Sequence, residues 1–357
     1  MNAVHSTVDL DDADGLIAAD RDGLLRAAST AGAQVRATAA ALAEGALDPL
    51  RGEYRTRTVI WVAGRGTAET AGGLLAATSG GSAGAPFVVT ADAPTWIGAL
   101  DVLVVAGDDP GDPALVAAAA TGVRRGARVV VAAPYEGPLR DATAGRAAVL
   151  EPRLPVPEEF GLCRYLAVGL ATLETVDPKL RTDLAALADE LDAEALRNST
   201  GREVFTNPAK ALAGRMSQRS VVLAGDCAAT LALARHGSSS MLRIAHRVAA
   251  ATGLADALVA LRGMPAEPQD DIFHDDEIDG PRGDRLRVLA LTLAAERTVV
   301  AARVARLADV DIVGAGDVPD ASDAGPVPVG SARAEQQLAV LAVRLEMAAV
   351  YLRLARG

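Results

Sequence analysis

Short apolar runs alternate with helix-type stretches over most of the chain. The first run, "TVIWVAG" at 58–64, leads into a glycine turn, and further runs lie at 87–91, 101–107 and 127–134. Runs without interleaved polar residues are typical of strands buried on both faces. The stretches between them are rich in Ala and Leu and predict helices, including one over 67–77. This pattern predicts a parallel sheet with helices on both faces.

The same pattern restarts after a proline-dense stretch at 151–161. The run "SVVLAGD" at 220–226 is followed by an Ala/Thr-rich helical stretch, in the same order as residues 59–76. We therefore predict two α/β domains of one kind in tandem. The further elements predicted in the second domain are a helix over 238–253, strands at 256–261, 285–293 and 310–316, and a helix over 295–308.

Helical segments flank and join the two predicted sheets. Apolar spacing predicts one or two amphipathic helices over 11–46, a pair over 161–175 and 179–197, and a Leu-lined helix at the end of the chain. The predicted boundaries are an N-terminal helical segment at 1–50, a first sheet domain at 51–157, a helical connector at 158–206, a second sheet domain at 207–330 and a C-terminal helix at 331–357.

Composition narrows the classes of partner. The 357 residues are 50% hydrophobic but only 3% aromatic, and the formal net charge is −11. Binding to nucleic acid or to an anionic membrane needs a basic surface, so neither is expected. The polar start and the lack of an apolar run of about 18–20 residues predict a cytoplasmic protein. Cys163 and Cys227 have no paired or metal-ligand spacing, so we expect free thiols.

The glycine turn after the first strand is a candidate anion site. "GRGTAE" at 64–69 offers the Arg65 guanidinium, the Gly66 backbone and the Thr67 hydroxyl. It is also half of a dinucleotide fingerprint, with a glutamate where the third glycine belongs and Asp92 as a ribose-binding acid. Phosphate binding by this turn and an NAD(P)-binding domain therefore both remain open.

A second candidate anion site lies in the second domain. Arg235 with Ser238, Ser239 and Ser240 would place a guanidinium and hydroxyls at the start of the helix predicted over 238–253, where free N–H groups favour anions. The alternative is an ordinary serine cap with an exposed arginine.

The turn after the strand at 101–107 is acidic. Asp108, Asp109 and Asp112 would repel a phosphate dianion, but they complement the positive amino end of the helix that follows. We therefore expect this turn not to hold phosphate.

No cofactor or metal is expected. The four histidines have no metal-ligand spacing. His274 with Asp275, Asp276 and Glu277 could hold a hard cation, although this stretch is also typical of a solvated acidic loop.

Two segments carry a resemblance to a known family. "NPAKALAGR" at 207–215 and the ending "VGSARAEQQLAVLAVRLEMAAVYLRLARG" resemble the bifunctional phosphoglucose/phosphomannose isomerases, most closely an actinobacterial branch labelled TobH. The resemblance implies an α/β fold of two tandem SIS-type (sugar-isomerase) doubly wound parallel-sheet domains with flanking helices. It implies a homodimer and a sugar-phosphate substrate, with fructose 6-phosphate interconverted with glucose or mannose 6-phosphate.

The resemblance also implies site residues, and here the chain departs from the family. The proton-transfer glutamate falls near Leu242, and no lysine follows Lys210 to match the C-terminal catalytic one. His274 matches the ring-opening histidine, with Glu277 beside it as a candidate base. Two functions follow, an aldose–ketose isomerase of hexose 6-phosphates or a non-catalytic sugar-phosphate sensor or regulatory partner, with an NAD(P)-binding protein as a more distant third.

Overall fold

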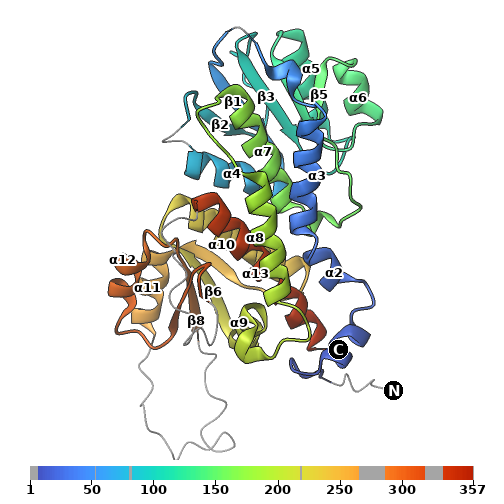
Figure 1. The fold of residues 1–357 in the computed structure, drawn as a ribbon. Helices are drawn as coiled ribbons and strands as arrows, with labels where there is room; N and C mark the ends of the chain where they lie inside the picture. The colour runs from blue at the N-terminus through green and yellow to red at the C-terminus, as the bar shows by residue number, and fades with distance from the viewer. Residues whose placement is uncertain are drawn as a thin grey trace, which may run out of the picture.

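Two α/β units stack along the long axis of the molecule (Figure 1). The structure is a computed structural model that describes residues 7–52, 54–79, 83–217, 219–264, 286–317 and 333–356. Each unit contains one all-parallel sheet, of five strands in the first and four in the second. The predicted α/β class with two tandem parallel sheets is confirmed.

The first sheet has the doubly wound order β2-β1-β3-β4-β5. Alternate side chains of strand β1 enter two separate cores, since Val59 and Trp61 lie in one apolar cluster and Ile60 and Val62 in another. This two-sided burial explains why residues 59–62 of the strand are all apolar. The strands are β1 (Thr58–Val62), β2 (Phe87–Thr90), β3 (Asp101–Ala106), β4 (Arg128–Ala132) and β5 (Ala147–Val149), and the helices are α4 (Gly66–Ser79), α5 (Pro113–Arg124) and α6 (Gly137–Thr143).

The second sheet repeats this order with one strand fewer, as β7-β6-β8-β9. Its strand β9 is therefore an edge in the described sheet, where the corresponding β4 of the first sheet pairs with β5. The strands are β6 (Ser220–Gly225), β7 (Ala250–Gly253), β8 (Leu286–Leu291) and β9 (Val310–Val313), and the helices are α10 (Ala228–Arg243), α11 (Leu254–Gly263) and α12 (Arg297–Val304).

Two predicted elements of the second domain are wrong. The helix predicted over 238–253 is the end of α10 followed by β7, and the strand predicted at 256–261 lies inside α11. Leu254, Ala257 and Leu258 are the buried positions of α11, and this spacing belongs to one face of a helix. A short apolar run does not distinguish a strand from a buried helix segment, and here tertiary packing decided for the helix.

Helices connect the two sheets through a shared core. One apolar cluster includes Trp61 of β1, Leu223 of β6 and Leu345 of α13, so the units are not separated by solvent. Helix α13 is buried along almost its whole length, including the charged Arg344 and Glu346, and its apolar residues are not confined to one face. The remaining elements are α1 (Ala13–Ala19), α2 (Leu24–Ala28), α3 (Ala31–Ala43), α7 (Leu162–Val176), α8 (Leu184–Arg197), α9 (Pro208–Met216) and α13 (Ala334–Leu354), with short 3-10 turns at Asp48–Leu50, Glu158–Phe160 and Val204–Thr206.

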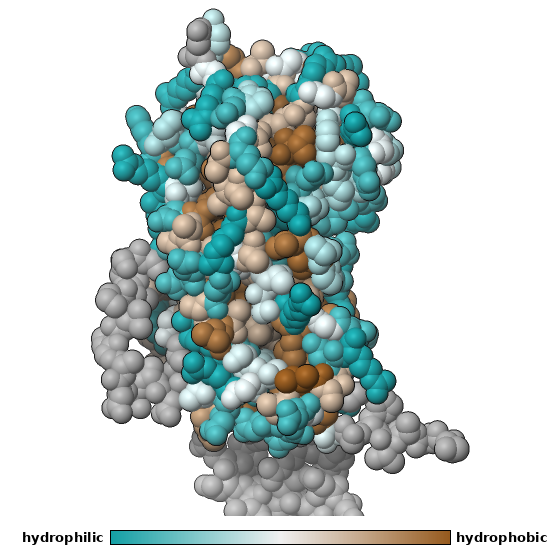
Figure 2. Space-filling view, turned by 45° about the vertical axis from the view of Figure 1, so that its right-hand side comes forward, coloured by the Kyte–Doolittle hydropathy of each residue, from teal (hydrophilic) through white to brown (hydrophobic). Residues whose placement is uncertain are grey.

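The surface is mixed in character. In the view of Figure 2 hydrophilic residues dominate, and the hydrophobic ones are scattered between them. Among the described helices none is both long and apolar enough to cross a bilayer. Both cysteines are free, as expected, with Cys163 buried.

Candidate functional site

A cavity of about 330 Å³ opens at the carboxyl ends of β1 and β3. In the order β2-β1-β3-β4-β5 the chain reverses direction of winding between these two strands, and ligands of doubly wound sheets bind in the crevice at that position. The cavity is lined by the turn after β1, the turn after β3, Glu158 and two residues of α10, in full Gly64, Arg65, Gly66, Thr67, Ala106, Gly107, Asp108, Asp109, Asp112, Leu115, Glu158, Ser239 and Arg243.

The turn after β1 brings the amino end of α4 to this cavity. Gly66 starts the helix at a φ of +67°, a conformation that favours glycine. The side chain of Arg65 is 72% exposed, whereas Thr67 is buried and its hydroxyl donates to the Glu158 carbonyl at 3.1 Å. The turn therefore offers an exposed guanidinium and a helix amino end, but its hydroxyl is already used to hold the segment at 158–160.

The acidic turn after β3 is paired residue by residue. Asp108 accepts from Arg164 Nη2 at 2.8 Å, and Asp112 caps α5 by accepting from the Ala114 N–H at 2.8 Å. Asp109 accepts from the Gly111 N–H at 2.8 Å and lies 3.7 Å from the Arg65 guanidinium. Helix capping is thus the role of Asp112, as the sequence indicated, while Asp108 is an ion-pair partner.

Arg164 supports this turn from inside the fold. It is 8% exposed, and its guanidinium stacks over the Tyr165 ring at 4.1 Å from the centroid. Within the described residues, Arg164 Nη1 and the Tyr165 hydroxyl have no hydrogen-bond partner. Burial raises the pKa of Tyr165, so its hydroxyl stays protonated at neutral pH.

Helix α10 of the second domain closes the cavity from the other side. Ser239 and Arg243 line it, one helical turn apart, and Arg243 pairs with Glu158 and with Glu159 at 3.0 Å. A Cβ placed on Gly66 would lie 4.0 Å from Arg243 Nη1, so this guanidinium approaches the amino end of α4. Sequence reasoning missed Arg243, and extending the helix through 228–243 would have placed it on the face of Ser239.

The structure gathers four of the predicted ligand residues at one cavity: Arg65, Gly66, Thr67 and Ser239. Their predicted companions are elsewhere on α10. Arg235 is exposed and does not line the cavity, and Ser238 donates to the Ala249 carbonyl at 2.6 Å. Ser240 is buried inside the same helix. These residues lie mid-helix, so the helix start predicted for them is wrong, because α10 begins ten residues before Ser238 at Ala228.

The two predicted catalytic residues, His274 and Glu277, lie outside the described residues. Leu242, near which the family resemblance would place a glutamate, is 58% exposed on α10. Asp92, the candidate ribose acid, follows β2 and is exposed. In the described part of the chain no three His, Cys, Asp or Glu side chains are grouped as metal ligands.

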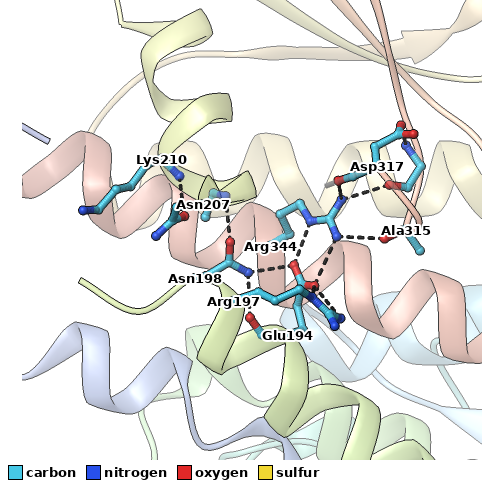
Figure 3. A network of polar contacts seen from close by, with 10 residues as sticks. Glu194, Arg197, Asn198, Asn207, Lys210, Ala315, Asp317 and Arg344 are labelled. Carbon is cyan, nitrogen blue, oxygen red and sulfur yellow. Dashed lines mark hydrogen bonds and ion pairs between the residues drawn. The ribbon is translucent and has the colours of Figure 1, made fainter. Parts of the chain in front are cut away.

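The "NPAK" segment is structural in this fold. Asn207 caps α9 by accepting from the Lys210 N–H at 2.9 Å, and Pro208 occupies the first turn of that helix. The Lys210 ammonium is fully buried and donates to the carbonyls of Thr200 and Arg202 at 2.8 and 2.7 Å. Figure 3 shows this segment joining the network around Glu194 and Arg344. It does not line the cavity at β1 and β3.

Comparison with known proteins places the fold. No family profile matches the sequence, and no curated protein matches it. Solved structures do match over nearly the whole length. Tagatose-6-phosphate ketose/aldose isomerase from Escherichia coli is 16% identical with a TM-score of 0.62, covering 99% of this chain and 96% of that one.

Two further matches agree. A glucose-6-phosphate isomerase like protein from Thermus thermophilus is 19% identical with a TM-score of 0.52, covering 98% of this chain and 94% of that one. The C-terminal domain of glucosamine-fructose-6-phosphate aminotransferase from Francisella tularensis is 12% identical with a TM-score of 0.58, covering 95% of this chain and 98% of that one. The class defined by the fold is an α/β protein of two parallel sheets. More particularly, its fold is similar to that of these phosphosugar isomerase and aminotransferase structures.

Proposed function

We propose that this chain is a sugar-phosphate-binding protein that uses the cavity at the carboxyl ends of β1 and β3. The observation that carries the proposal is the convergence of two arginines from different domains, Arg65 and Arg243, on the amino end of α4. A helix amino end with flanking guanidinium groups is favourable for a phosphoryl group. The cavity of about 330 Å³ is of the size that small-molecule sites have.

The carboxylates of the same cavity suit the sugar rather than the phosphate. Asp108 and Asp112 are held by Arg164 and by the amino end of α5, which leaves Asp109 and Glu158 as the more accessible acceptors. Side chains of Asp109 and Glu158 are 54% and 51% exposed. Ionised carboxylates only accept hydrogen bonds, and sugar hydroxyls can supply the donors. The ligand would thus lie with its phosphoryl group at α4 and its hydroxyls toward β3.

Titration calorimetry tests this proposal. Wild type should bind glucose 6-phosphate and fructose 6-phosphate, and an Arg65→Gln/Arg243→Gln variant should bind them at least about tenfold more weakly, because each charge-assisted hydrogen bond contributes ~1.5–3 kcal/mol. Arg235→Gln is the matched control, since it removes one exposed arginine of α10 that does not line the cavity. No binding of either sugar phosphate by folded wild type would refute the proposal.

Aldose–ketose isomerisation is the second candidate function, favoured by the likeness in fold to the tagatose-6-phosphate isomerase. It requires a base at C1/C2 and an acid for ring opening. The resemblance of the sequence to the isomerase family suggests Glu277 and His274 for these roles. A coupled assay with fructose 6-phosphate at high protein concentration tests it, with His274→Ala and Glu277→Gln expected to remove turnover and leave binding intact. Binding without turnover by wild type would support a sensor or regulatory role.

A further inference from the structure

A second cavity, of about 380 Å³, lies in the other domain and is not used by the function proposed above. It opens between one face of α9, strand β9 and the turn that follows β9. Its lining residues are Pro208, Ala211, Leu212, Arg215, Arg297, Ile312, Val313, Gly316, Asp317 and Arg344. A smaller cavity of about 70 Å³ lies against the same turn and shares Arg297 and Asp317.

The lining of this cavity is basic. Among the described residues, the lining includes three arginines, Arg215, Arg297 and Arg344, and one carboxylate, that of Asp317. Arg297 pairs with Asp317 at 2.8 Å, and Arg215 lies 3.9 Å from Asp311, which is already bound in two places by Arg287. The side chains of Arg215 and Arg297 are both 46% exposed, so they can reach a ligand.

Arg344 shapes the cavity. Its guanidinium is 1% exposed and all five N–H groups are bonded (Figure 3). Two N–H groups bind the Glu194 carboxylate at 2.7 and 3.1 Å, and three bind the carbonyls of Gly314, Ala315 and Asp317 at 2.8–3.0 Å. The Arg344 side chain therefore fixes the turn at 314–317 in the absence of a ligand.

Asp317 also fixes this turn, through its own carboxylate. Its carboxylate accepts from the Gly314 N–H at 2.7 Å and from Arg297 at 2.8 Å. The Arg297 guanidinium is thereby held at the mouth of the cavity. Pro208, Ala211 and Leu212 add apolar lining from one face of α9, and such a surface suits the carbon part of a ligand.

We propose that this cavity is a second ligand site of the chain, one for a small organic phosphate whose phosphoryl group binds between Arg215 and Arg297. Guanidinium groups bind phosphate oxygens through paired N–H donors, and prior fixation of the site lowers the ordering cost of binding. The site is separate from the cavity at β1 and β3, with which it shares no lining residue.

Calorimetric titration of the full chain with inorganic phosphate and with glucose 6-phosphate tests this proposal. Arg215→Gln/Arg297→Gln should weaken one binding event at least about tenfold, while Arg65→Gln/Arg243→Gln should leave that event unchanged. Arg306→Gln is the matched control, because Arg306 is exposed in the same domain and does not line the cavity. Circular dichroism verifies that each variant is folded.

The two sites can fail separately. If Arg65→Gln/Arg243→Gln abolishes all binding, or if Arg215→Gln/Arg297→Gln changes none of it, the second site is refuted and the function proposed above stands. If only Arg215→Gln/Arg297→Gln removes binding, the second site stands and the first proposal falls.

A variant that is expected to bind more tightly distinguishes a change at the site from a folding defect. Asp317→Asn removes the carboxylate that the described residues contribute to the lining, and it keeps an oxygen that can accept from the Gly314 N–H. It should bind inorganic phosphate about threefold or more tightly, because Arg297 loses its competing partner. Unchanged or weaker binding by this variant would overturn the second site.

Discussion

The two cavities are built alike and differ in charge. Each is supported by a buried arginine that holds the turn after a strand, Arg164 beneath the turn after β3 and Arg344 beneath the turn after β9. Arg164 binds a carboxylate of the turn itself, Asp108, so the acids face the first cavity. Arg344 binds backbone carbonyls and takes its counter-charge from Glu194, which does not line the second cavity. In these two cavities, the position of the buried arginine's counter-ion thus decides the charge of the lining.

The domains also differ at the position where the winding of each sheet reverses. In the first sheet this position is open and carries the candidate site. In the second, a Cβ on Gly225 would lie 2.2 Å from the Leu231 backbone nitrogen, so α10 packs directly on the end of β6. Asp226 is paired with Arg303 of α12 over the same turn. The space in the second domain is instead beside β9, the strand that lacks a further described neighbour.

Removing the buried arginines gives the largest expected difference between the two cavities. Arg344→Met should lower the free energy of unfolding by about 3–5 kcal/mol, because it leaves Glu194 buried without its main partner. Arg164→Met should cost less, about 1–3 kcal/mol, because the side chain of Asp108 is 32% exposed and can be hydrated. Urea unfolding at pH 7 measures both. Equal losses would mean that the two arginines play the same structural part.

The pH dependence of the Glu194 pair sharpens this comparison. Burial alone would raise the pKa of Glu194, but Arg344, Arg197 and Asn198 lower it below its ordinary value of 4.5. The pair therefore contributes stability above pH 4.5, and this contribution is lost as the pH falls through the lowered pKa. The stability difference between wild type and Glu194→Gln should be largest near pH 7 and shrink below pH 4.5 in urea unfolding series. A difference independent of pH would contradict a charged pair.

Glu346, two residues after Arg344, is the opposite case. Its hydrogen-bond partner is a histidine: Glu346 Oε1 lies 2.8 Å from His236 Nε2, and Cys163 is buried nearby. Burial raises its pKa above 4.5, and the His236 hydrogen bond offsets this only in part. Wild type relative to Glu346→Gln should be most stable below pH 4.5 and lose that advantage as the pH rises. At pH 7 the change should stay within about 1.5 kcal/mol. A dependence with the sign expected for Glu194 would contradict this assignment.

The smallest expected effect concerns the charge of the first cavity. Asp109→Asn should tighten inorganic phosphate binding there about two- to fivefold, since it frees Arg65 from an exposed ion pair. Asp92→Asn is the control, because it removes an exposed carboxylate that does not line the cavity. Calorimetry in low salt measures the change, which should vanish in the Arg65→Gln background. If the change persists there, Asp109 acts on the ligand independently of Arg65.

Prediction from the sequence succeeded where residues act locally. Strands β1 to β4 of the first sheet, the glycine turn before α4 and the capping by Asp112 follow from short patterns, whereas the three-residue strand β5 was not predicted. Prediction failed where a strand and a buried helix have the same local pattern. Residues 256–261 were predicted as a strand but lie in helix α11 (Leu254–Gly263). Arg243 was missed because its position at the cavity depends on the packing of α10 against the first domain.

The sequence by itself determined the two parallel sheets, because continuous apolar strands between helices have few other ways to be buried. It also determined that three acids stand at the turn after β3. Only the tertiary structure decided which charges meet. Arg164, Arg243 and Arg344 come from helices distant in sequence, and their pairing with Asp108, Glu158 and Glu194 sets the character of each cavity. The physical reason is that charge pairing depends on distance in space. Hydrophobic periodicity along the chain does not show which residues are close in space.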